Sequence, residues 1–365
     1  MSATGLAPRL EEAIARLLPD PGQTLLLRTC LNRGPGAADA WQEWRARQAD
    51  PAEGLRRTFP GEATFLTPML HHGLRAAGAD PGDTELAATL SAAAMREERR
   101  AVKLHAGAAA VLAELREAGL DPIVLRGVAL AELAYPQPGL RHTHDLDLLL
   151  GPEEQERAVE ALGALGGSAP DGRSGRGDTV VLHPLGVPVA MHATLCVVRG
   201  PAMPIEAVRS RCIRAPIGGA ETLVLAPDDE LLHVIAQSVT GPVPASIRWV
   251  PDAWFLLGTG IEPDWERLAA TAEEARLGVV GLGALTYLAG LGLPVPETAF
   301  ASLREATARC GREEADFVLL AALRAQRRRR RPVGAAALPV TALAVARRLP
   351  VALADRARGR GPRRR

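Results

Sequence analysis

IVLRGVALAELAYPQPGLRHTHDLDLLL, residues 123–150, is the stretch around which the rest of the chain is organised. Asp145 and Asp147 stand one residue apart in it, within a run that is otherwise apolar. In an extended strand residues i and i+2 share a face, so both carboxylates are predicted to point to one spot while Leu146 and Leu148 face the core. Two like charges held that close repel unless a cation lies between them. Mg²⁺ fits this pattern, because it takes one or two carboxylates and leaves its other positions to water and phosphate.

The pattern around this stretch changes from helical to mixed and back to helical. Helical spacing and joints that contain Gly or Pro predict most of the elements. The expected helices are 6–18, 22–31, 37–48, 60–77 and 83–119, then 128–135 and 152–165, then 228–240, 246–258, 263–276, 277–291, 296–309 and 312–330. The expected strands are 123–125, the strand that carries the two aspartates, 179–183, 187–195 and 221–225. This order predicts an α+β protein.

The same order predicts how the chain divides into regions. We expect an N-terminal helical region over 1–105, an α/β core over 106–226, a C-terminal helical region over 227–331 and a flexible basic tail over 332–365. The chain has 365 residues, which is enough for one large or two to three ordinary domains.

The bulk composition is that of a soluble globular protein, with 47% hydrophobic and 23% charged residues. The four cysteines are widely scattered and no pair has CxxC spacing, which favours reduced thiols over a zinc site or a redox motif. The N-terminus lacks the basic start and apolar core of a signal peptide, and no run of 18 apolar residues exists to span a bilayer. We therefore expect a cytoplasmic protein.

The charge is distributed unevenly along the chain. Fourteen arginines and one aspartate from Arg324 onward give that segment a charge of +13, whereas the whole chain carries +1, so the rest carries −12. A run such as Arg327 to Arg331 is a candidate surface for nucleic acid or for an anionic membrane. We favour a solvated helix end followed by a basic tail, because no aromatic residues interleave with these arginines to stack on bases.

Several short motifs lie in and around the central stretch. They are Leu125-Arg126-Gly127, Ala129-Leu130, Tyr135-Pro136, Pro138-Gly139, Arg141 and Asp145-Leu146-Asp147-Leu148-Leu149. Weaker ones follow at 189–192 (VAMH), 223–232 (LVLAPDDELL), 249–252 (WVPD) and 264–265 (DW). Together they resemble the signature of an uncharacterised nucleotidyltransferase family of the DNA polymerase β-like superfamily, LKG-x-A-L, Y-P-x-P-G-x-R and D-h-D-h-L, where h is apolar. The similarity covers the chain from about residue 20 to about residue 300.

The resemblance implies a mixed-sheet nucleotidyltransferase core wrapped by helices. Such enzymes move a nucleoside monophosphate from an NTP to a hydroxyl and release pyrophosphate. Asp145 and Asp147 would ligate two Mg²⁺ ions that bridge the triphosphate and activate the acceptor oxygen. Gly127, where a strand ends and a helix begins, would let the backbone approach phosphate. Arg126, where the family usually has Lys, and Arg141 are the expected phosphate-binding cations.

The chain departs from the superfamily at the position of a third carboxylate, which the match places at Ala190. Alanine neither binds metal nor takes a proton, and three interpretations stay open. The enzyme works with two carboxylates and uses His192, which shares a strand face with Ala190, or a water as base. Another acid, Asp178 or Glu206, reaches the site. Or the chain is a nucleotide-binding or scaffold protein in which catalysis is impaired.

The acceptor is expected to be a small molecule, a natural-product intermediate, or a peptide or protein side chain, and the sequence carries no code for it or for the base of the NTP. Two further polar residues receive structural interpretations. We expect His144 to alternate away from Asp145 and to brace the loop. We expect Asp252 to cap a helix or to pair within the C-terminal helices.

Overall fold

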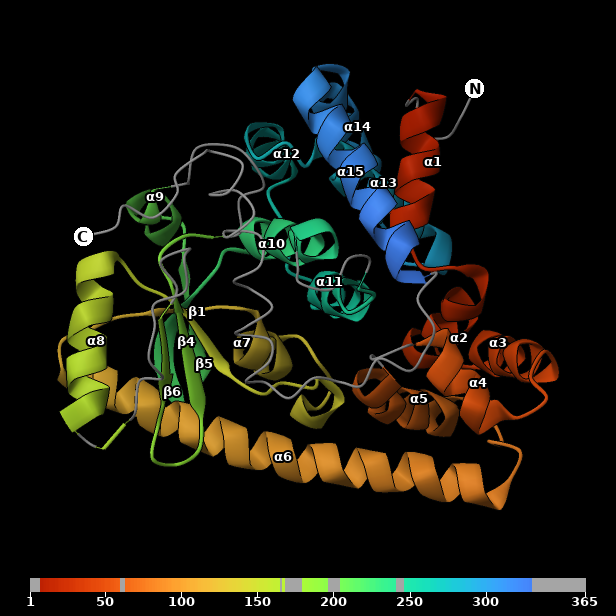
Figure 1. The fold of residues 1–365 in the computed structure, drawn as a ribbon, viewed down its shortest axis with the longest axis horizontal. Coiled ribbons are helices and arrows are strands. Elements are labelled where there is room, and N and C mark those ends of the chain that lie inside the picture. Colours follow the sequence, from red (N-terminus) through yellow and green to blue (C-terminus); the bar gives the residue numbers. More distant parts are fainter. Residues whose placement is uncertain are drawn as a thin grey trace, which may run out of the picture.

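The computed structural model describes residues 7–59, 63–164, 166–167, 179–195, 204–240 and 246–329 (Figure 1). The first helices are α1 (Pro8–Leu17), α2 (Pro21–Leu31), α3 (Pro35–Ala46), α4 (Pro51–Thr58), α5 (Ala63–Ala77) and α6 (Thr84–Glu117). The middle of the chain holds β1 (Ile123–Val124), α7 (Arg126–Leu133), η1 (Pro138–Leu140), β2 (Leu146–Leu149), α8 (Pro152–Ala164), β3 (Thr179–Leu182), β4 (Pro188–His192), α9 (Ile205–Arg209), β5 (Ile213–Ile217) and β6 (Ala220–Val224). The last helices are α10 (Pro227–Thr240), α11 (Trp249–Gly258), α12 (Trp265–Glu274), α13 (Gly278–Leu291), α14 (Glu297–Ala308) and α15 (Arg312–Arg329).

Local chemistry places many of the helix ends. The Asp20 side chain and Gln23 form a capping box at the start of α2, and the Asp83 carboxylate caps α6 by accepting the Leu86 N–H. The 34-residue α6 ends beside Gly119, whose φ of +70° suits the left-handed position that follows a helix. The expected helix over 83–119 is thus confirmed to within two residues at either end.

The strands form one mixed six-stranded sheet in the order β3-β4-β2-β1-β6-β5. β2 runs parallel to β4 and antiparallel to β1, while β1 runs parallel to β6. β3 and β5 form the two edges, each antiparallel to its neighbour. β2, which carries Asp147, therefore lies inside the sheet, with a strand on each side.

The two faces of the sheet are buried against different elements. On one face the strands pack on α6 and α8, with Leu146 and Leu148 fully buried among residues such as Val111 and Leu115 of α6. The opposite face is apolar toward α9, where Ile123, Leu149 and Leu223 meet Val208. Leu146 and Leu148 thus face the core, as the alternation predicted, and Asp147 points to the other face.

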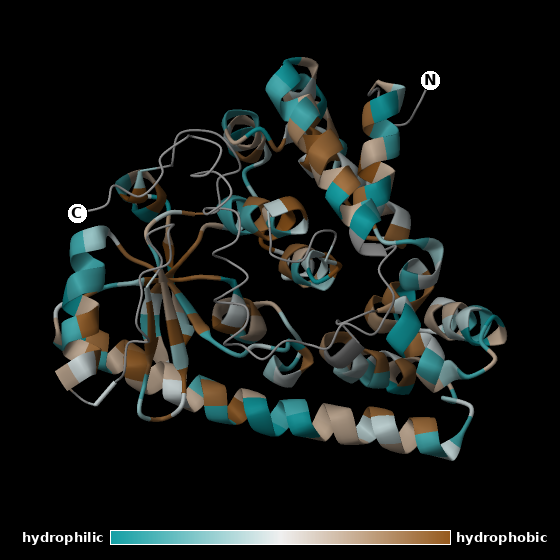
Figure 2. Cartoon of the chain, in the orientation of Figure 1, coloured by the Kyte–Doolittle hydropathy of each residue, from teal (hydrophilic) through white to brown (hydrophobic). Residues whose placement is uncertain are grey.

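The N- and C-terminal helices share one hydrophobic core. Leu26 of α2 and Leu285 of α13 belong to the same buried cluster, and α1 packs against α15 (Figure 1). α6 joins this core to the sheet, since its two apolar parts flank a polar middle around residues 96–100 (Figure 2). The predicted boundary between residues 105 and 106 falls inside this continuous helix.

The α+β architecture with a mixed sheet and flanking helices is confirmed, and the differences from the expected elements are local. α4, α9 and β5 were not expected, and α7 begins at Arg126, two residues earlier than predicted. β2 begins at Leu146, so Asp145 lies in a bend just outside the strand. The predicted basic tail over 332–365 lies outside the described residues.

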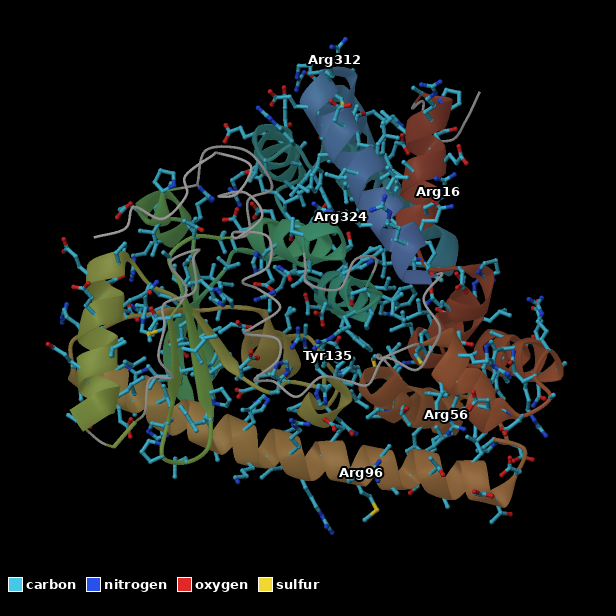
Figure 3. All side chains as sticks on the ribbon, viewed as in Figure 1. Arg16, Arg56, Arg96, Tyr135, Arg312 and Arg324 are labelled. Carbon is cyan, nitrogen blue, oxygen red and sulfur yellow. The ribbon has the colours of Figure 1, made fainter. Side chains whose placement is uncertain are left out.

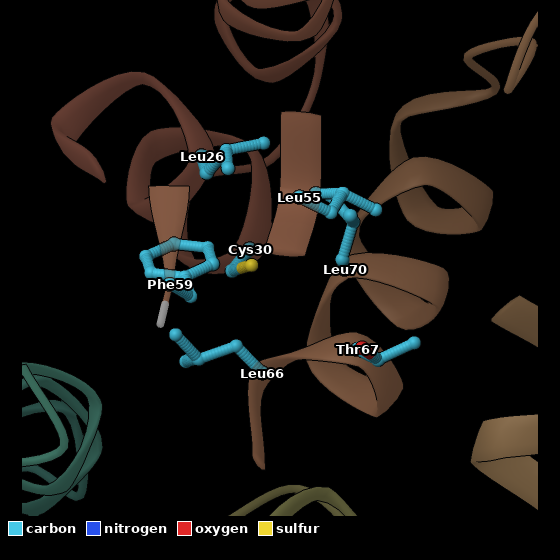
Figure 4. A pocket seen from close by; sticks show the side chains of 7 residues that line it. All are labelled: Leu26, Cys30, Leu55, Phe59, Leu66, Thr67 and Leu70. Atoms are coloured by element: carbon cyan, nitrogen blue, oxygen red, sulfur yellow. The ribbon is translucent and has the colours of Figure 1, made fainter. Parts of the chain in front are cut away.

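A small pocket lies among the N-terminal helices (Figure 4). It is lined by Leu26, Cys30, Leu55, Phe59, Leu66, Thr67 and Leu70. This lining is almost entirely apolar and carries no charge, so the pocket offers nothing to bind phosphate. Cys30, Cys212 and Cys310 are free thiols, and within the described part of the chain no helix is long and apolar enough to cross a membrane.

Candidate functional site

Asp145 and Asp147 lie at the start of β2, on the side of the sheet away from α6. Leu125 N–H donates to the Asp147 carbonyl at 3.0 Å, which fixes β2 against the segment that leaves β1. The Asp147 side chain is 13% exposed and that of Asp145 is 28% exposed. Both carboxylates are therefore partly buried and accessible from one side only.

The two carboxyl groups have opposite pKa shifts. Burial, together with the nearby Asp147 charge, raises the pKa of Asp145 above its usual range. Burial also acts on Asp147, but the Arg126 guanidinium and a hydrogen bond from His192 outweigh it and hold the pKa of Asp147 well below its usual range. The repulsion that the sequence predicted is thus present at Asp145, while Asp147 is already neutralised by protein groups.

Arg126 is the cation beside Asp147. Its Nη2 lies 3.3 Å from Asp147 Oδ2, and its Nε is buried without a hydrogen-bond partner. Its φ of +36° is in the left-handed region, and Arg126 and Arg276 are the only non-glycine residues of the described chain with positive φ. The strand exit predicted at Arg126-Gly127 is in fact the first turn of α7.

The strand β4 lies directly beside Asp147. Ala190 is the Cα partner of Asp147 in the parallel pairing, so position 190 is where a third carboxylate would face the same spot. His192, two residues further, places Nε2 at 2.8 Å from Asp147 Oδ1. An ionised carboxylate only accepts, so Nε2 of His192 donates the proton of this hydrogen bond.

Two further basic residues lie near Asp145, His144 in the loop before β2 and Arg248 just before α11. His144 Nε2 lies 3.5 Å from Asp145 Oδ2, so His144 turns toward Asp145 rather than away from it, because both residues precede the strand and its alternation does not apply. Arg248 donates to the His142 carbonyl at 3.0 Å and covers the Phe65 ring at 4.3 Å. The charge of Arg248 partly opposes the rise in the pKa of Asp145. The sequence motifs did not point to Arg248 as a site residue.

Arg141 forms a closed hydrogen-bonded pair. Its Nε and Nη2 each donate to a different oxygen of Asp252 at 2.8 Å, and its Nη1 donates to Thr143 at 3.0 Å. The Tyr135 hydroxyl, near the centre of Figure 3, donates to Asp252 at 2.6 Å. Asp252 thus pairs with the loop before β2 and not within the C-terminal helices. The phosphate-binding role of Arg141 stays a prediction, and every nitrogen of its guanidinium has a protein partner.

Gly127 is buried where α7 meets the loop before β2. A β-carbon there would lie 2.9 Å from Thr143 Cγ2 and 3.6 Å from the carbonyl oxygen of Asp145. Glycine is therefore required for this close approach, which holds Asp145 against α7. Contact of Gly127 with phosphate stays a prediction.

The first turns of α10 carry a group of buried polar residues. The sequence predicted only that a helix starts here. Asp228 pairs with Arg267 at 2.7 Å and Asp229 with Arg211 at 2.9 Å. Glu230 and His233 are 5% and 6% exposed, and Glu230 Oε1 and both ring nitrogens of His233 have no hydrogen-bond partner.

The unpartnered atoms of α10 lie close to the aspartate site. Burial lowers the pKa of His233 well below its usual range, and the next contributions come from Arg126, His192 and Asp147. In the described chain six buried side-chain atoms lack a partner, and four of them belong to Arg126, Glu230 and His233. The signal in the sequence was a Glu and a His at i and i+3, which lie on one face of a helix, followed by the apolar residues Val234, Ile235 and Ala236.

The donor set suits Mg²⁺ with two protein carboxylates. No group of three His, Cys, Asp or Glu side chains within the described residues is arranged to hold a metal ion. Asp145 and Asp147 supply the one or two carboxylates that Mg²⁺ takes. Burial and then the Asp147 charge raise the pKa of Asp145, and a bound cation would oppose both effects. Of the alternative acids, Glu206 lies exposed on α9, and Asp178 lies outside the described residues.

One comparison with known proteins, the family match, agrees with the motifs. A family described as uncharacterised nucleotidyltransferases matches residues 62–291, which confirms the resemblance drawn from the central stretch. A solved structure of the antibiotic-resistance factor ANT(2'')-Ia is similar to this chain with 13% sequence identity and a TM-score of 0.29, over 63% of this chain and 94% of that one. No curated protein matches the chain.

Proposed function

The chain belongs to the family of uncharacterised nucleotidyltransferases, and from this premise we propose that it transfers a nucleoside monophosphate from an NTP to an acceptor hydroxyl with Mg²⁺. The acceptor is a small molecule, a natural-product intermediate, or a peptide or protein side chain. The observation that carries the proposal is the pair of neighbouring carboxylates, Asp145 and Asp147, beside the half-buried Arg126. The Asp147 charge helps to raise the pKa of Asp145. A structural ion pair would need one carboxylate, not two that repel each other.

The proposal gives each residue a role. Asp145 and Asp147 would hold the metal, which supplies charge stabilisation to the triphosphate and polarises the attacking hydroxyl. Both oxygens of Asp147 have protein partners, His192 and Arg126, so a metal at Asp147 requires Arg126 to move aside. We propose that its guanidinium exchanges Asp147 for a phosphate oxygen when the NTP binds.

In the reaction the acceptor oxygen forms a bond to the α-phosphorus, and the bond from that phosphorus to the β-phosphate oxygen breaks, so that pyrophosphate leaves. The hydroxyl proton needs a base, and with alanine at position 190 the base would be His192. The Asp147 carboxylate orients its ring and stabilises the imidazolium that forms. Arg126 and Arg248 lie near enough to the aspartates to neutralise charge on the triphosphate.

The pairing of Ala190 with Asp147 favours a second candidate function, a nucleotide-binding or scaffold protein in which catalysis is impaired. A protein of this second kind would bind the nucleotide at the same site but would not transfer the nucleoside monophosphate. Ala190→Glu tests it, because the new carboxylate would stand beside Asp147 on the same face of the sheet.

The test is release of pyrophosphate from each of the four NTPs with Mg²⁺ and a panel of hydroxyl acceptors. We expect turnover by the wild-type chain that falls by at least about a hundredfold in Asp145→Asn and Asp147→Asn, because the charge stabilisation of the transition state is lost. Asp83→Asn is the matched control, since asparagine caps α6 as well as aspartate does and Asp83 is remote from the site.

The outcomes separate the two candidates. Wild-type turnover that Asp145→Asn and Asp147→Asn remove supports the enzyme and rejects the impaired form. Binding of Mg·NTP without turnover, with turnover gained in Ala190→Glu, supports the impaired form. Turnover that both Asp→Asn variants retain would overturn the site assignment.

A further inference from the structure

Two of the N-terminal helices contact the loop before β2. His142, in this loop, is 8% exposed, and its Nδ1 lies 2.7 Å from Glu97 Oε2. Glu97 is a buried acid in the polar middle of α6. The His142 ring packs on Phe65 of α5, with the ring centroids 4.5 Å apart. Helices α5 and α6 thus hold His142 three residues before Asp145.

The contacts of His142 continue to Arg248, which lies just before α11. Arg248 Nη2 donates to the His142 carbonyl at 3.0 Å, and the guanidinium covers the Phe65 ring at 4.3 Å. A guanidinium is attracted to the face of an aromatic ring, so a flat surface and a hydrogen bond together orient this side chain. Phe65, Glu97, His142 and Arg248 form one connected group, which we call the Phe65 cluster.

The Phe65 cluster lies beside the aspartate site. His142 and Asp145 belong to the same short loop, and the ring centroids of His142 and His144 are 6.0 Å apart. His144 Nε2 in turn lies 3.5 Å from Asp145 Oδ2. The Arg248 charge partly opposes the rise in the pKa of Asp145, which agrees with this placement.

We propose that the other three residues of the Phe65 cluster are positioning residues, which hold the Arg248 guanidinium beside Asp145 so that it binds the triphosphate. This inference rests on the proposed function and deepens it, because it gives residues of the N-terminal helices a part in the nucleotide site.

Arg248 differs from Arg126 in how it is held. Arg126 pairs with Asp147 and has to exchange that carboxylate for phosphate, whereas a carbonyl oxygen and a ring without net charge orient Arg248. These two contacts orient the guanidinium of Arg248 without cancelling its charge. A side chain that is already held in place loses less freedom when it binds its ligand. Arg248 is therefore the cation that is preorganised for phosphate.

The test is calorimetric binding of inorganic tripolyphosphate with Mg²⁺ to the full chain, with urea denaturation of each variant. Arg248→Met keeps a long side chain and removes its charge, and Arg248→Lys keeps a charge. Phe65→Leu keeps an apolar side chain and removes the ring face. Phe300→Leu is the matched control, because Arg304 covers the Phe300 ring at 5.6 Å on α14, which packs on α12 and α13.

We expect Arg248→Met to weaken tripolyphosphate binding by about tenfold or more, because a charged hydrogen bond to phosphate is lost, and Arg248→Lys to recover part of that loss. Phe65→Leu should weaken binding by about threefold, and so should Glu97→Leu, which removes the partner of His142. Neither change should weaken binding further in the Arg248→Met background, because both act through one guanidinium. Phe300→Leu should leave binding unchanged.

Losses of binding that add up in the double variants would overturn the positioning role, because a general structural effect on the loop does not act through Arg248. Wild-type affinity in Arg248→Met would overturn the inference as well. Loss of binding in Asp145→Asn would then leave the proposed function standing. A wild-type chain that binds no tripolyphosphate would contradict both the inference and the proposed function.

Discussion

Two arginine–aspartate pairs lie at the centre of the molecule and differ in how completely they are hydrogen-bonded. In the closed pair, Arg141 and Asp252 share two bonds of 2.8 Å, and Tyr135 and Thr143 complete the set. In the open pair, Arg126 touches Asp147 once, at 3.3 Å.

The surroundings of the two pairs differ in the same way. Next to the open pair, Arg126 Nε, Glu230 Oε1 and both His233 nitrogens have no partner. Buried polar groups in folded proteins are normally satisfied, so this cluster is a candidate place for a ligand or an ordered water to complete the set. The closed pair joins the loop before β2 to α11, which favours a structural role. The open pair is the one that we assign to the proposed site.

The largest expected effect is the loss of protein stability when the closed pair is broken. Arg141→Ala leaves the Asp252 charge buried without its cation and should lower the free energy of unfolding by about 3–5 kcal/mol. Arg126→Gly should lower it by less, because glycine adopts the positive φ without strain and His192 still binds Asp147.

Urea denaturation of both variants measures this difference. Equal losses of unfolding free energy in the two variants would show that the closed and the open pair stabilise the protein to the same extent, and would contradict the distinction between them.

The next effect is the pH dependence of protein stability that Glu230 causes. Burial raises the pKa of Glu230 from 4.5 to about 7, so the folded chain holds a proton that the unfolded chain has released. Stability of the wild type therefore falls as pH rises through this window. Glu230→Gln has no proton to lose and should gain up to about 3 kcal/mol relative to the wild type across it.

Urea denaturation of the wild type and of Glu230→Gln at several pH values between about 4 and about 8 gives this difference. A difference that stays constant over the window would contradict an ionisable, poorly satisfied Glu230.

The smallest effect concerns the contact between α7 and the loop before β2. Gly127→Ala places a β-carbon 2.9 Å from Thr143 Cγ2, and relieving that overlap should cost about 1–3 kcal/mol. It should also weaken Mg·NTP binding, since the loop that moves carries Asp145.

Gly163→Ala is the control, because no atom within 4 Å would meet its β-carbon and alanine is the better helix former. Thermal unfolding with calorimetric binding measures both variants. A Gly127→Ala chain as stable as the wild type would mean that the loop shifts without cost.

Much of the fold follows from local patterns in the sequence. The apolar alternation around Asp147 predicted a strand with one buried face. Gly119 indicated where α6 ends, and Pro227 indicated where α10 begins. The motif match placed the third carboxylate at position 190 of a neighbouring strand, and the structure shows Ala190 as the Cα partner of Asp147 in the parallel pairing of β2 and β4. β5 and α9 were missed because each is only five residues long and shows no clear period.

The pairs that define the site could be predicted less well, because they join residues far apart in the chain. Arg141 and Asp252 are 111 residues apart, and no local pattern links them. Glu230 follows Asp228 and Asp229, so its position in the sequence is that of an ordinary acidic first turn. The influence of Arg126 on its pKa depends on where α10 lies in the tertiary structure, which the local sequence pattern does not encode.

Asp145 and Asp147 are proposed to form a binding site for a metal–triphosphate. This proposal is tested by calorimetric titration of each of the four NTPs with Mg²⁺ into the wild-type chain and into Asp147→Asn. We expect binding of at least one NTP to the wild type that is lost in Asp147→Asn and on chelation of Mg²⁺. Binding that survives both changes, or a wild-type chain that binds none of the four NTPs, would contradict it.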